Sequence, residues 1–456
     1  MYEQLFRNAF FPLYEGPIKR RNTHVYLHQY ELSQWLEPAA LESQQLEKLN
    51  AVLDHCWRNV PFLREHWSRA GLRPGRLTRV ADISHFPLLD KTLIKDNYEG
   101  MRATVPVGRV YSKTTGGSTG DPFRFEYTQE SYARRTAVMW RGYRWCGTDL
   151  GRRTAYVWGA SMPAPGLRGI KDRLYHRAFN RLILNSFEMT EDNLAWYAGQ
   201  LRRFAPRVIV GYVAPLRMLA QWSNTRGLQL CRPETVITGA EPLTGIDREI
   251  IGRAFDAPVH NTYGCREVML LACECAERNG LHISADHLLA ETVDGQGRPV
   301  AGEIGDICIT DFHNYAMPLI RYLNGDRATS TDRTCACGRG LPLLESIDGR
   351  ILDVIVSPDG RTVPGEYFVY VMLDFPDVRQ WQVVQKSIDA IEVLIARKQP
   401  LTKDERERMS GKIAARMGPL VQIAIKEVTG IPLTASGKRR VTVSEIAQPA
   451  SATRVQ

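Results

Sequence analysis

Apolar positions divide the chain into three stretches with different patterns. Over about the first 100 residues, leucines and tryptophans recur at helical spacing, most clearly from Glu31 to Arg58, a run with a single proline and no glycine. From about Arg109, short β-rich runs alternate with helical runs. After Arg350 a second mixture of strands and helix begins, and residues 446–456 carry no pattern. These patterns predict a helical start followed by two parts that mix strands and helices.

The middle stretch predicts an α/β fold. Strands that alternate with helices usually pair in parallel, so we expect a mostly parallel sheet. The expected strands are Thr154–Trp158, Val208–Val210 and Glu234–Thr238, and the expected helices are Leu216–Arg226 and Ile246–Ala254.

The last stretch predicts a small α+β unit of ordinary domain size. The expected strands are Trp381–Lys386, Ala390–Ala396 and Val421–Val428, with a charged helix, Thr402–Met417, between the last two. The predicted organisation is therefore an N-terminal domain over 1–350 with a helical start over about 1–100, a C-terminal domain over 351–445, and a disordered tail over 446–456.

Composition is that of a folded protein, with 44% hydrophobic and 24% charged residues, and 456 residues suggest two or three domains. The formal net charge is +9, from 59 basic and 50 acidic residues. Arginines cluster over 134–144 and, with Lys171, over 168–181. We interpret both clusters as solvated helix faces. A phosphate-rich ligand or a peripheral contact with a membrane surface is the alternative.

No run reaches the about 18 apolar residues of a membrane span, so no transmembrane segment is expected. The start, Met1 to Arg21, lacks the apolar block of a signal peptide. Nine cysteines without an export signal favour a reducing, cytoplasmic location. In that compartment, clustered cysteines are more often metal ligands than disulfides.

A run of glycines and hydroxyl residues lies between two expected strands, from Thr114 to Pro122. Glycines allow a tight backbone whose N–H groups turn inward, and hydroxyls add donors, so the run can cradle phosphate oxygens. It lacks the ending of a Walker loop, and a plain loop is the alternative interpretation. The candidate phosphate-binding residues are Thr115, Gly116, Gly117, Ser118, Thr119 and Gly120.

Five further motifs follow in order. An aromatic before a glycine offers a stacking face, a carboxylate three residues after that glycine could hold magnesium, and an aspartate after a glycine turn could bind ribose hydroxyls. Surface turns are the alternative for each. The motifs are Gly239-Ala240-Glu241-Pro242, Tyr263-Gly264-Cys265-Arg266-Glu267, the segment Arg321 to Asp326, Gly349-Arg350, and the segment Pro432 to Lys438.

The order of these motifs resembles that of the adenylate-forming superfamily of acyl-CoA synthetases, peptide-synthetase adenylation domains and luciferases. Within it, the chain is most similar to the phenylacetate–CoA ligase-like group, which includes proteins encoded with capsule polysaccharide genes. The likeness covers Leu46 to Val443. It implies a large N-terminal domain, a small mobile C-terminal domain, and ATP-dependent conversion of a carboxylic acid to an acyl-AMP, with coenzyme A as the expected acceptor.

The resemblance also implies a role for each motif. The loop Thr115–Gly120 would hold the β- and γ-phosphates, and Gly239–Pro242 would flank the adenine together with Tyr263. Glu267 would bind magnesium. Asp326 would bind the ribose, Arg350 the ribose and phosphate, and Lys438 would stabilise charge as the carboxylate attacks the α-phosphate.

The chain departs from the family pattern at three places. Arg266 stands where a threonine is common, Asp121 where a lysine is common, and Leu352, beside Asp353, where the hinge aspartate is usual. These departures put the hinge position in doubt and, less strongly, the ordinary two-step cycle.

Two Cys-x-Cys pairs, about sixty residues apart, suit a tetrahedral zinc site, with buried free thiols as the alternative. Some relatives combine one such cysteine and a histidine with a later CxCGR. On that resemblance we expect a structural zinc, with Cys273 as a reserve ligand. The expected ligands are Cys275, His282, Cys335 and Cys337.

Three alternatives to the coenzyme A ligase stay open. The acyl group could pass to an amine or hydroxyl in surface-polysaccharide assembly, or the protein could bind nucleotide without activity. A zinc-containing nucleic-acid binder would suit the net charge, but the aromatic and basic residues form no nucleic-acid-reading motif, so we expect no nucleic-acid partner. The sequence leaves the acid, the acceptor and the oligomeric state open.

Overall fold

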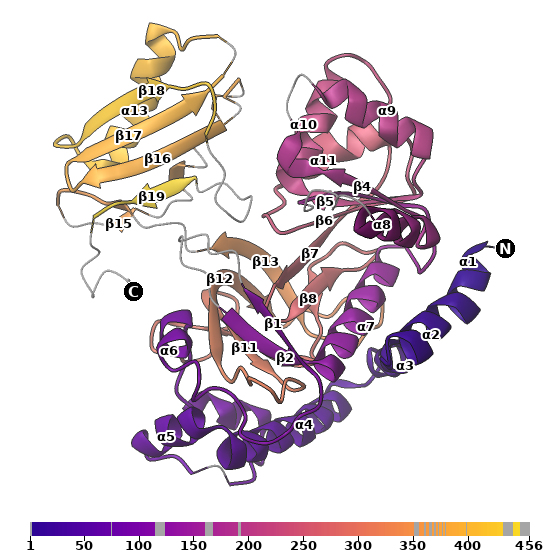
Figure 1. Cartoon of the computed structure of the whole chain (residues 1–456). Helices are drawn as coiled ribbons and strands as arrows, with labels where there is room; N and C mark the ends of the chain where they lie inside the picture. Colours follow the sequence, from indigo (N-terminus) through magenta and orange to yellow (C-terminus); the bar gives the residue numbers. More distant parts are fainter. Residues whose placement is uncertain are drawn as a thin grey trace. The chain divides into compact units, whose positions relative to one another are not determined.

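The computed structural model in Figure 1 describes residues 2–73, 75–114, 124–159, 167–189, 193–350 and, between 355 and 446, all but 360–361, 364–366, 369–370, 373, 376, 379, 398 and 432–440. The side chains of 167–170, 187, 349 and 350 also lie outside this description. Several expectations therefore fall on residues that are not described, namely Thr115–Gly120, Asp121, the side chain of Arg350, Leu352, Asp353, Lys438 and the tail from 447.

The chain separates into two compact units, the first ending at Asp348 and the second beginning at Gly349. The first begins with helices. Helix α4 starts at Pro38, because the first turn of a helix does not need the N–H that proline lacks. The residue before a proline disfavours helical geometry, so the helical run expected from Glu31 to Arg58 is interrupted between α3 and α4. The helical segments before the first strand are α1 (Tyr2–Leu5), η1 (Phe6–Phe10), α2 (Phe11–Leu13), η2 (Tyr14–Ile18), α3 (Thr23–Ser33), α4 (Pro38–Asn59), α5 (Pro61–Arg69), η3 (Val80–His85) and α6 (Lys91–Asp96).

A separate hairpin, β1 (Val110–Thr114) with β2 (Arg124–Thr128), brackets the predicted phosphate loop. Its register pairs Val110 with Thr128 and Thr114 with Arg124. Thr128 then caps the next helix, because its hydroxyl accepts the backbone N–H of Ser131 at 3.0 Å. The hairpin therefore holds the two ends of the predicted loop side by side.

An eleven-stranded sheet forms the frame of the first unit, in the order β10-β11-β12-β13-β9-β8-β7-β6-β5-β3-β4. The strands from β7 to β4 pair in parallel, and helices connect them. The elements of this part are α7 (Gln129–Trp145), β3 (Thr154–Trp158), α8 (Leu167–Ala178), β4 (Arg181–Asn185), η4 (Ser186–Glu188), α9 (Leu194–Phe204), β5 (Val208–Tyr212), α10 (Val213–Asn224), β6 (Thr235–Gly239), α11 (Gly245–Phe255) and β7 (Val259–Cys265).

The other half of the sheet is antiparallel, so the expectation of a mostly parallel sheet is wrong there. Its strands follow one another without helices in between, and such connections return the chain in the opposite direction. The α/β fold class itself is confirmed. The strands are β8 (Met269–Glu274), β9 (Leu281–Ile283), β10 (Leu288–Val293), β11 (Ile304–Asp311), β12 (Tyr322–Thr331) and β13 (Leu343–Arg350).

The second unit contains a four-stranded sheet in the order β18-β17-β16-β19 (Figure 1). Its helix α13 begins with a capping box, in which the Thr402 hydroxyl and the Glu405 carboxylate accept each other's backbone N–H groups. Met409 and Ile413 of this helix are buried in the core of the unit. The elements are β14 (Ile355–Val356), β15 (Thr362–Val363), β16 (Gln380–Ser387), β17 (Ala390–Ala396), α13 (Lys403–Met417), β18 (Gln422–Glu427) and β19 (Thr442–Ser444).

None of the helices in the described part of the chain combines the length and the apolar character that a membrane span requires.

Candidate active site and metal centre

Strand β12 presents polar side chains on one face. Tyr322, Asn324 and Asp326 are buried, whereas Gly325 between the last two is exposed. This follows the two-residue repeat of a strand, in which every second side chain points the same way. Sequence reasoning selected only Asp326, although the same repeat was visible in the segment from Arg321 to Asp326 and could have identified Tyr322 and Asn324.

Tyr263 of β7 is tied to this face. Its hydroxyl donates to Asp326 Oδ2 at 2.8 Å and accepts from Asn324 Nδ2 at 2.7 Å. The Asn324 amide also donates to Asp326 Oδ2 at 2.9 Å. Burial raises the pKa of Tyr263 well above its usual value, and the negative charge of Asp326 raises it further. The hydroxyl therefore keeps its proton and remains a donor. The predicted adenine and ribose residues thus form one hydrogen-bonded wall.

Glu267 follows β7 in the turn that leads to β8. Only 3% of it is exposed, and the Tyr322 hydroxyl donates to its Oε1 at 2.7 Å. Gly264, near the end of β7, has no room for a side chain, because a Cβ there would lie 1.8 Å from the Met269 carbonyl oxygen of β8. Since Tyr322 shares the face of β12 with Asp326, the predicted magnesium and ribose ligands belong to the same wall.

The segment Gly239–Pro242 follows β6, the parallel neighbour of β7. A Cβ on Gly239 would come 2.8 Å from the Thr262 hydroxyl, so only glycine fits this close approach. The Glu241 carboxylate accepts the backbone N–H of Ala214 at 2.7 Å, in the first turn of α10. Glu241 therefore anchors the segment to a helix terminus.

Arg266 lies beside the start of the predicted phosphate loop. It is exposed, and its Nη1 donates to the carbonyl oxygen of Thr114 at 2.8 Å. Burial lowers the pKa of the neighbouring Lys113, and the charges of Arg135 and Arg266 lower it further. Lys113 and Arg266 thus bring two cationic groups close to the last described residue before that loop, which favours an anionic ligand there.

Two arginines of α7 are buried, so the interpretation of 134–144 as a solvated face is wrong for them. Arg135 Nη2 lies 2.7 Å from Asp311 Oδ2, and Arg141 Nη1 lies 2.5 Å from Asp286 Oδ2. None of these four side chains is more than 2% exposed. A buried guanidinium needs an acidic partner, and the sequence pattern did not reveal one because both partners lie more than 140 residues away.

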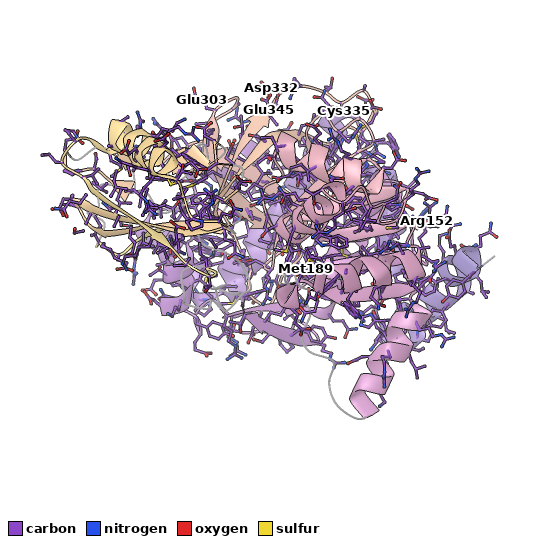
Figure 2. The ribbon with its side chains drawn as sticks, turned by 90° about the horizontal axis from the view of Figure 1, so that it is seen from above. Arg152, Met189, Glu303, Asp332, Cys335 and Glu345 are labelled. Atoms are coloured by element: carbon purple, nitrogen blue, oxygen red, sulfur yellow. The ribbon has the colours of Figure 1, made fainter. Side chains whose placement is uncertain are left out.

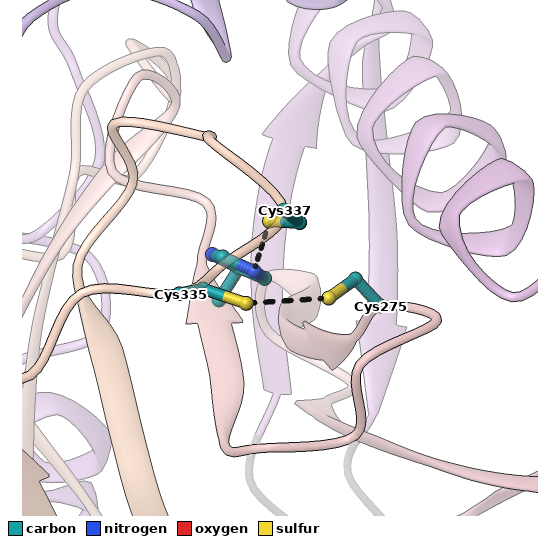
Figure 3. Close-up of side chains that lie close together, drawn as sticks. Cys275, Cys335 and Cys337 are labelled. Carbon is teal, nitrogen blue, oxygen red and sulfur yellow. Dashed lines mark hydrogen bonds between the residues drawn. The ribbon is translucent and has the colours of Figure 1, made fainter.

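The four predicted zinc ligands lie together (Figure 3). Cys275 Sγ is 3.6 Å from Cys335 Sγ, and Cys337 Sγ is 3.3 Å from His282 Nε2. Cys275 follows β8, His282 lies in β9, and the other two lie between β12 and β13, where Figure 2 labels Cys335. All four ligand atoms lie within 4.8 Å of one another.

This spacing fits a tetrahedral zinc ion, whose ligands at about 2.0–2.3 Å lie about 3.6–3.8 Å apart. The other ring nitrogen of His282, Nδ1, is 3.3 Å from the Leu341 carbonyl oxygen, an arrangement that leaves Nε2 facing the thiols. Burial lowers the pKa of His282 to about 4, so the ring is neutral, as a metal ligand must be.

Cys273, the reserve ligand, is not part of this cluster. It is fully buried, its Sγ lies 3.5 Å from Cys146 Sγ, and it donates to the Gly142 carbonyl oxygen at 3.4 Å. Cys273 therefore packs against helix α7, and the structure favours the histidine-containing set of four over a set that includes Cys273.

Comparisons with known proteins agree with this architecture. Residues 355–445 match the family model of the CapK C-terminal domain. A phenylacetate–coenzyme A ligase from Thermus thermophilus is 27% identical over 449 residues, which cover 91% of this chain and 98% of that one. Protein CapK from Staphylococcus aureus is 24% identical over 97% of both chains.

Solved structures show the same fold. The structure of 2-hydroxyisobutyryl-CoA ligase in the postadenylation state superposes with a TM-score of 0.71, at 18% identity, over 91% of both chains. The anthranilate CoA ligase AuaEII, in complex with anthranoyl-AMP, superposes with a TM-score of 0.51 over 72% of this chain and 65% of that one. The chain is thus similar nearly end to end to phenylacetate–coenzyme A ligases and to CapK, and it shares the fold of the adenylate-forming CoA ligases.

Proposed function

We propose that the protein uses ATP to activate a carboxylic acid as an acyl-AMP and then transfers the acyl group to coenzyme A. In the first step, a carboxylate oxygen attacks the α-phosphorus and pyrophosphate leaves. In the second, the thiol sulfur attacks the acyl carbon, AMP leaves, and the thiol proton passes to solvent. The names of the relatives, four of them phenylacetate–coenzyme A ligases, support this reaction.

The observation that carries the proposal is the wall of Tyr263, Asn324, Asp326 and Glu267. Asn324 and Tyr263 both donate to one oxygen of Asp326, Oδ2, and so hold that carboxylate in one orientation. A fixed carboxylate can accept hydrogen bonds from the ribose hydroxyls of ATP, and positioning is much of the catalytic task. The Gly239–Pro242 segment, which follows the neighbouring strand, would flank the adenine.

Glu267 fits a magnesium ion, because it offers a carboxylate whose orientation is set by the Tyr322 hydroxyl. When bound, Mg²⁺ would neutralise charge on the phosphates. Arg266, beside Thr114, would add a cation on the protein side, and Thr115–Gly120 and Arg350 would hold the phosphates and the ribose. The Cys275, His282, Cys335 and Cys337 cluster would hold a structural zinc.

The test is pyrophosphate release across a panel of aromatic, fatty and sugar acids, first without and then with coenzyme A. At least one acid should support release, and coenzyme A should convert its adenylate to a thioester. If the protein binds ATP but releases pyrophosphate with none of the acids, the proposal is contradicted. The protein would then be a nucleotide binder without this activity.

A second acceptor is favoured by one observation, the CapK family model over residues 355–445. The alternative second step is transfer of the acyl group from acyl-AMP to an amine or hydroxyl group in surface-polysaccharide assembly. An acid that releases pyrophosphate, together with an adenylate that coenzyme A does not discharge, would select this alternative.

Replacing Glu267 by glutamine should raise the magnesium concentration for half-maximal adenylation about ten-fold and slow the reaction, because an amide cannot supply an anionic ligand. The amide oxygen can still accept the Tyr322 hydroxyl, so the fold should be retained. A magnesium titration of pyrophosphate release measures the effect. The control is Glu303→Gln, at an exposed carboxylate labelled in Figure 2, and should behave as wild type. Equal titrations for both variants would contradict the assignment.

Replacing Arg266 by threonine, the common family residue, should raise the KM for ATP about ten-fold or more. A charge-assisted hydrogen bond contributes about 1.5–3 kcal/mol, and 1.4 kcal/mol corresponds to ten-fold. Arg266→Lys keeps the charge and should recover part of the loss. If the KM for ATP is the same in wild type, threonine and lysine variants, Arg266 only tethers the end of β1 at Thr114.

A further inference from the structure

The chain begins with a continuous helical segment, Tyr2–Ile18, in which α-helical and π-helical turns alternate. Phe6, Phe11 and Glu15 are buried, at intervals of five and four residues. Phe6 packs edge-on against Phe179, just beyond helix α8, with ring centroids 5.0 Å apart. One face of the segment is therefore fixed to the body of the first unit.

A different face of the same segment carries apolar side chains into solvent. Leu5, Ala9, Leu13 and Ile18 are all exposed, at intervals of about one helical turn. The exposed fractions of the three large ones are 61%, 57% and 63%. Of the seventeen large apolar side chains that are exposed within the described residues, five lie in the segment Tyr2–Ile18. Isolated exposed leucines need no explanation, but this concentration indicates an interaction surface.

Three acidic groups of this region, Glu3, Glu15 and Glu31, are already neutralised within the protein. Glu3 pairs with Arg207 at 2.8 Å and with Arg152, which Figure 2 labels beside the N-terminal helix. Glu31 pairs with Arg144. The buried Glu15 accepts the Thr23 hydroxyl and lies 3.5 Å from Arg21. These carboxylates therefore add little negative potential to the exposed face.

Basic groups beside the face are not neutralised in this way. Lys19 and Arg20, at the end of the segment, are exposed, as are Lys171, Arg173 and Arg177 of α8. None of these five takes part in an ion pair with another described residue. Helix α8 packs along the segment, since the rings of Tyr14 and Tyr175 lie 6.0 Å apart. Leu174, next to Tyr175 in α8, is another exposed apolar side chain.

We propose that the face formed by Leu5, Leu13, Ile18, Lys19 and Arg20 docks on the surface of an anionic lipid bilayer. Exposed apolar side chains that enter the headgroup region, bordered by cations that meet lipid phosphates, are what a helix lying in the membrane plane requires. A second copy of this chain fits less well. The same face on a second copy would carry the same excess of positive charge and would supply no anionic groups for these cations to meet. The proposal is independent of the acid that the enzyme activates.

Vesicle sedimentation with the full-length protein tests this surface. The protein should bind vesicles that contain phosphatidylglycerol much more strongly than pure phosphatidylcholine vesicles, and binding should weaken as salt rises. The double variant Leu5→Glu/Leu13→Glu should reduce binding about ten-fold or more. Leu420→Glu, at a 74% exposed leucine of the second unit, should bind as wild type. Lys19→Gln/Arg20→Gln should lose most of the preference for phosphatidylglycerol.

Several results would overturn the proposal. They are an absence of vesicle binding, equal binding to both lipids, and wild-type binding by the leucine variant. Light scattering supplies one more such result. If the wild-type protein is a dimer and the leucine variant is a monomer, the face is an interface between copies of the chain. Melting temperature and pyrophosphate release should be unchanged in the leucine variant, since both side chains point into solvent. If the melting temperature of the leucine variant is lower than that of the wild type, the vesicle-binding comparison uses the Lys19→Gln/Arg20→Gln variant instead.

Discussion

Replacing Lys438 by alanine should lower the rate of acyl-AMP formation by about 10²–10³-fold while ATP binding is largely retained. The attack joins an anionic carboxylate to an anionic phosphate, so the site must supply positive charge in the transition state. Removal of one such charge-stabilising contact commonly costs about 10²–10³ in rate. The lysine closes the PLTASGK segment, inside the range that matches the CapK C-terminal family model.

The measurement is ATP–pyrophosphate exchange, with ATP affinity determined separately by equilibrium binding. Lys403→Ala serves as the matched control, because its side chain is 88% exposed and pairs only with Glu407 in the described part of the chain. Exchange near the wild-type rate in Lys438→Ala would remove this lysine from the chemistry. An equal loss in the Lys403 variant would show that the effect is one of general charge.

Replacing Cys335 by serine should cost the protein its zinc and lower its melting temperature by roughly 10 °C, because structural zinc contributes directly to folding. The wild-type protein, prepared without added metal, should contain about one zinc per chain. Two ligands, Cys275 and His282, come from the end of β8 and from β9, and the other two come from the loop between β12 and β13, so the ion would tie two distant segments of the first unit together. Activity should fall only as far as folding does.

Cys273→Ser is the control for this experiment. Cys273 lies two residues from the ligand Cys275 but contacts Cys146 and Gly142 instead of the cluster, so the variant should keep its zinc. Elemental analysis and melting curves of the three proteins decide the question. A zinc content near zero in folded wild-type protein would leave the four residues as ordinary thiols and an ordinary histidine.

Much of the local structure was predictable because its causes lie close together in the chain. The strand Thr154–Trp158 and the strand Ala390–Ala396 have the predicted bounds, and the helix predicted over Thr402–Met417 starts one residue later because Thr402 is its cap. Apolar spacing, capping residues and turn glycines act over a few residues, so a short window of sequence contains the information.

The candidate site was predictable in part. Motif order identified Tyr263, Glu267 and Asp326, but not Asn324 and Tyr322, which orient two of them through hydrogen bonds. Both lie in the motif segment Arg321 to Asp326, but their role depends on the packing that brings β7 and the turn after it against β12. The phosphate loop Thr115–Gly120 and Lys438 lie outside the described residues, and their roles remain predictions.

The sequence by itself determined the kind of fold, most elements, and the residue types available for chemistry. Only the tertiary structure decided which distant groups meet. In the folded chain, β8 pairs antiparallel with β7. Packing also places Asp311 beside the buried Arg135 and Asp286 beside the buried Arg141. It brings Cys275 Sγ to within 3.6 Å of the Sγ of a cysteine sixty residues away. Each of these outcomes depends on how whole elements pack to bury apolar surface. A buried charge or thiol receives its partner from that packing and not from its neighbours in sequence.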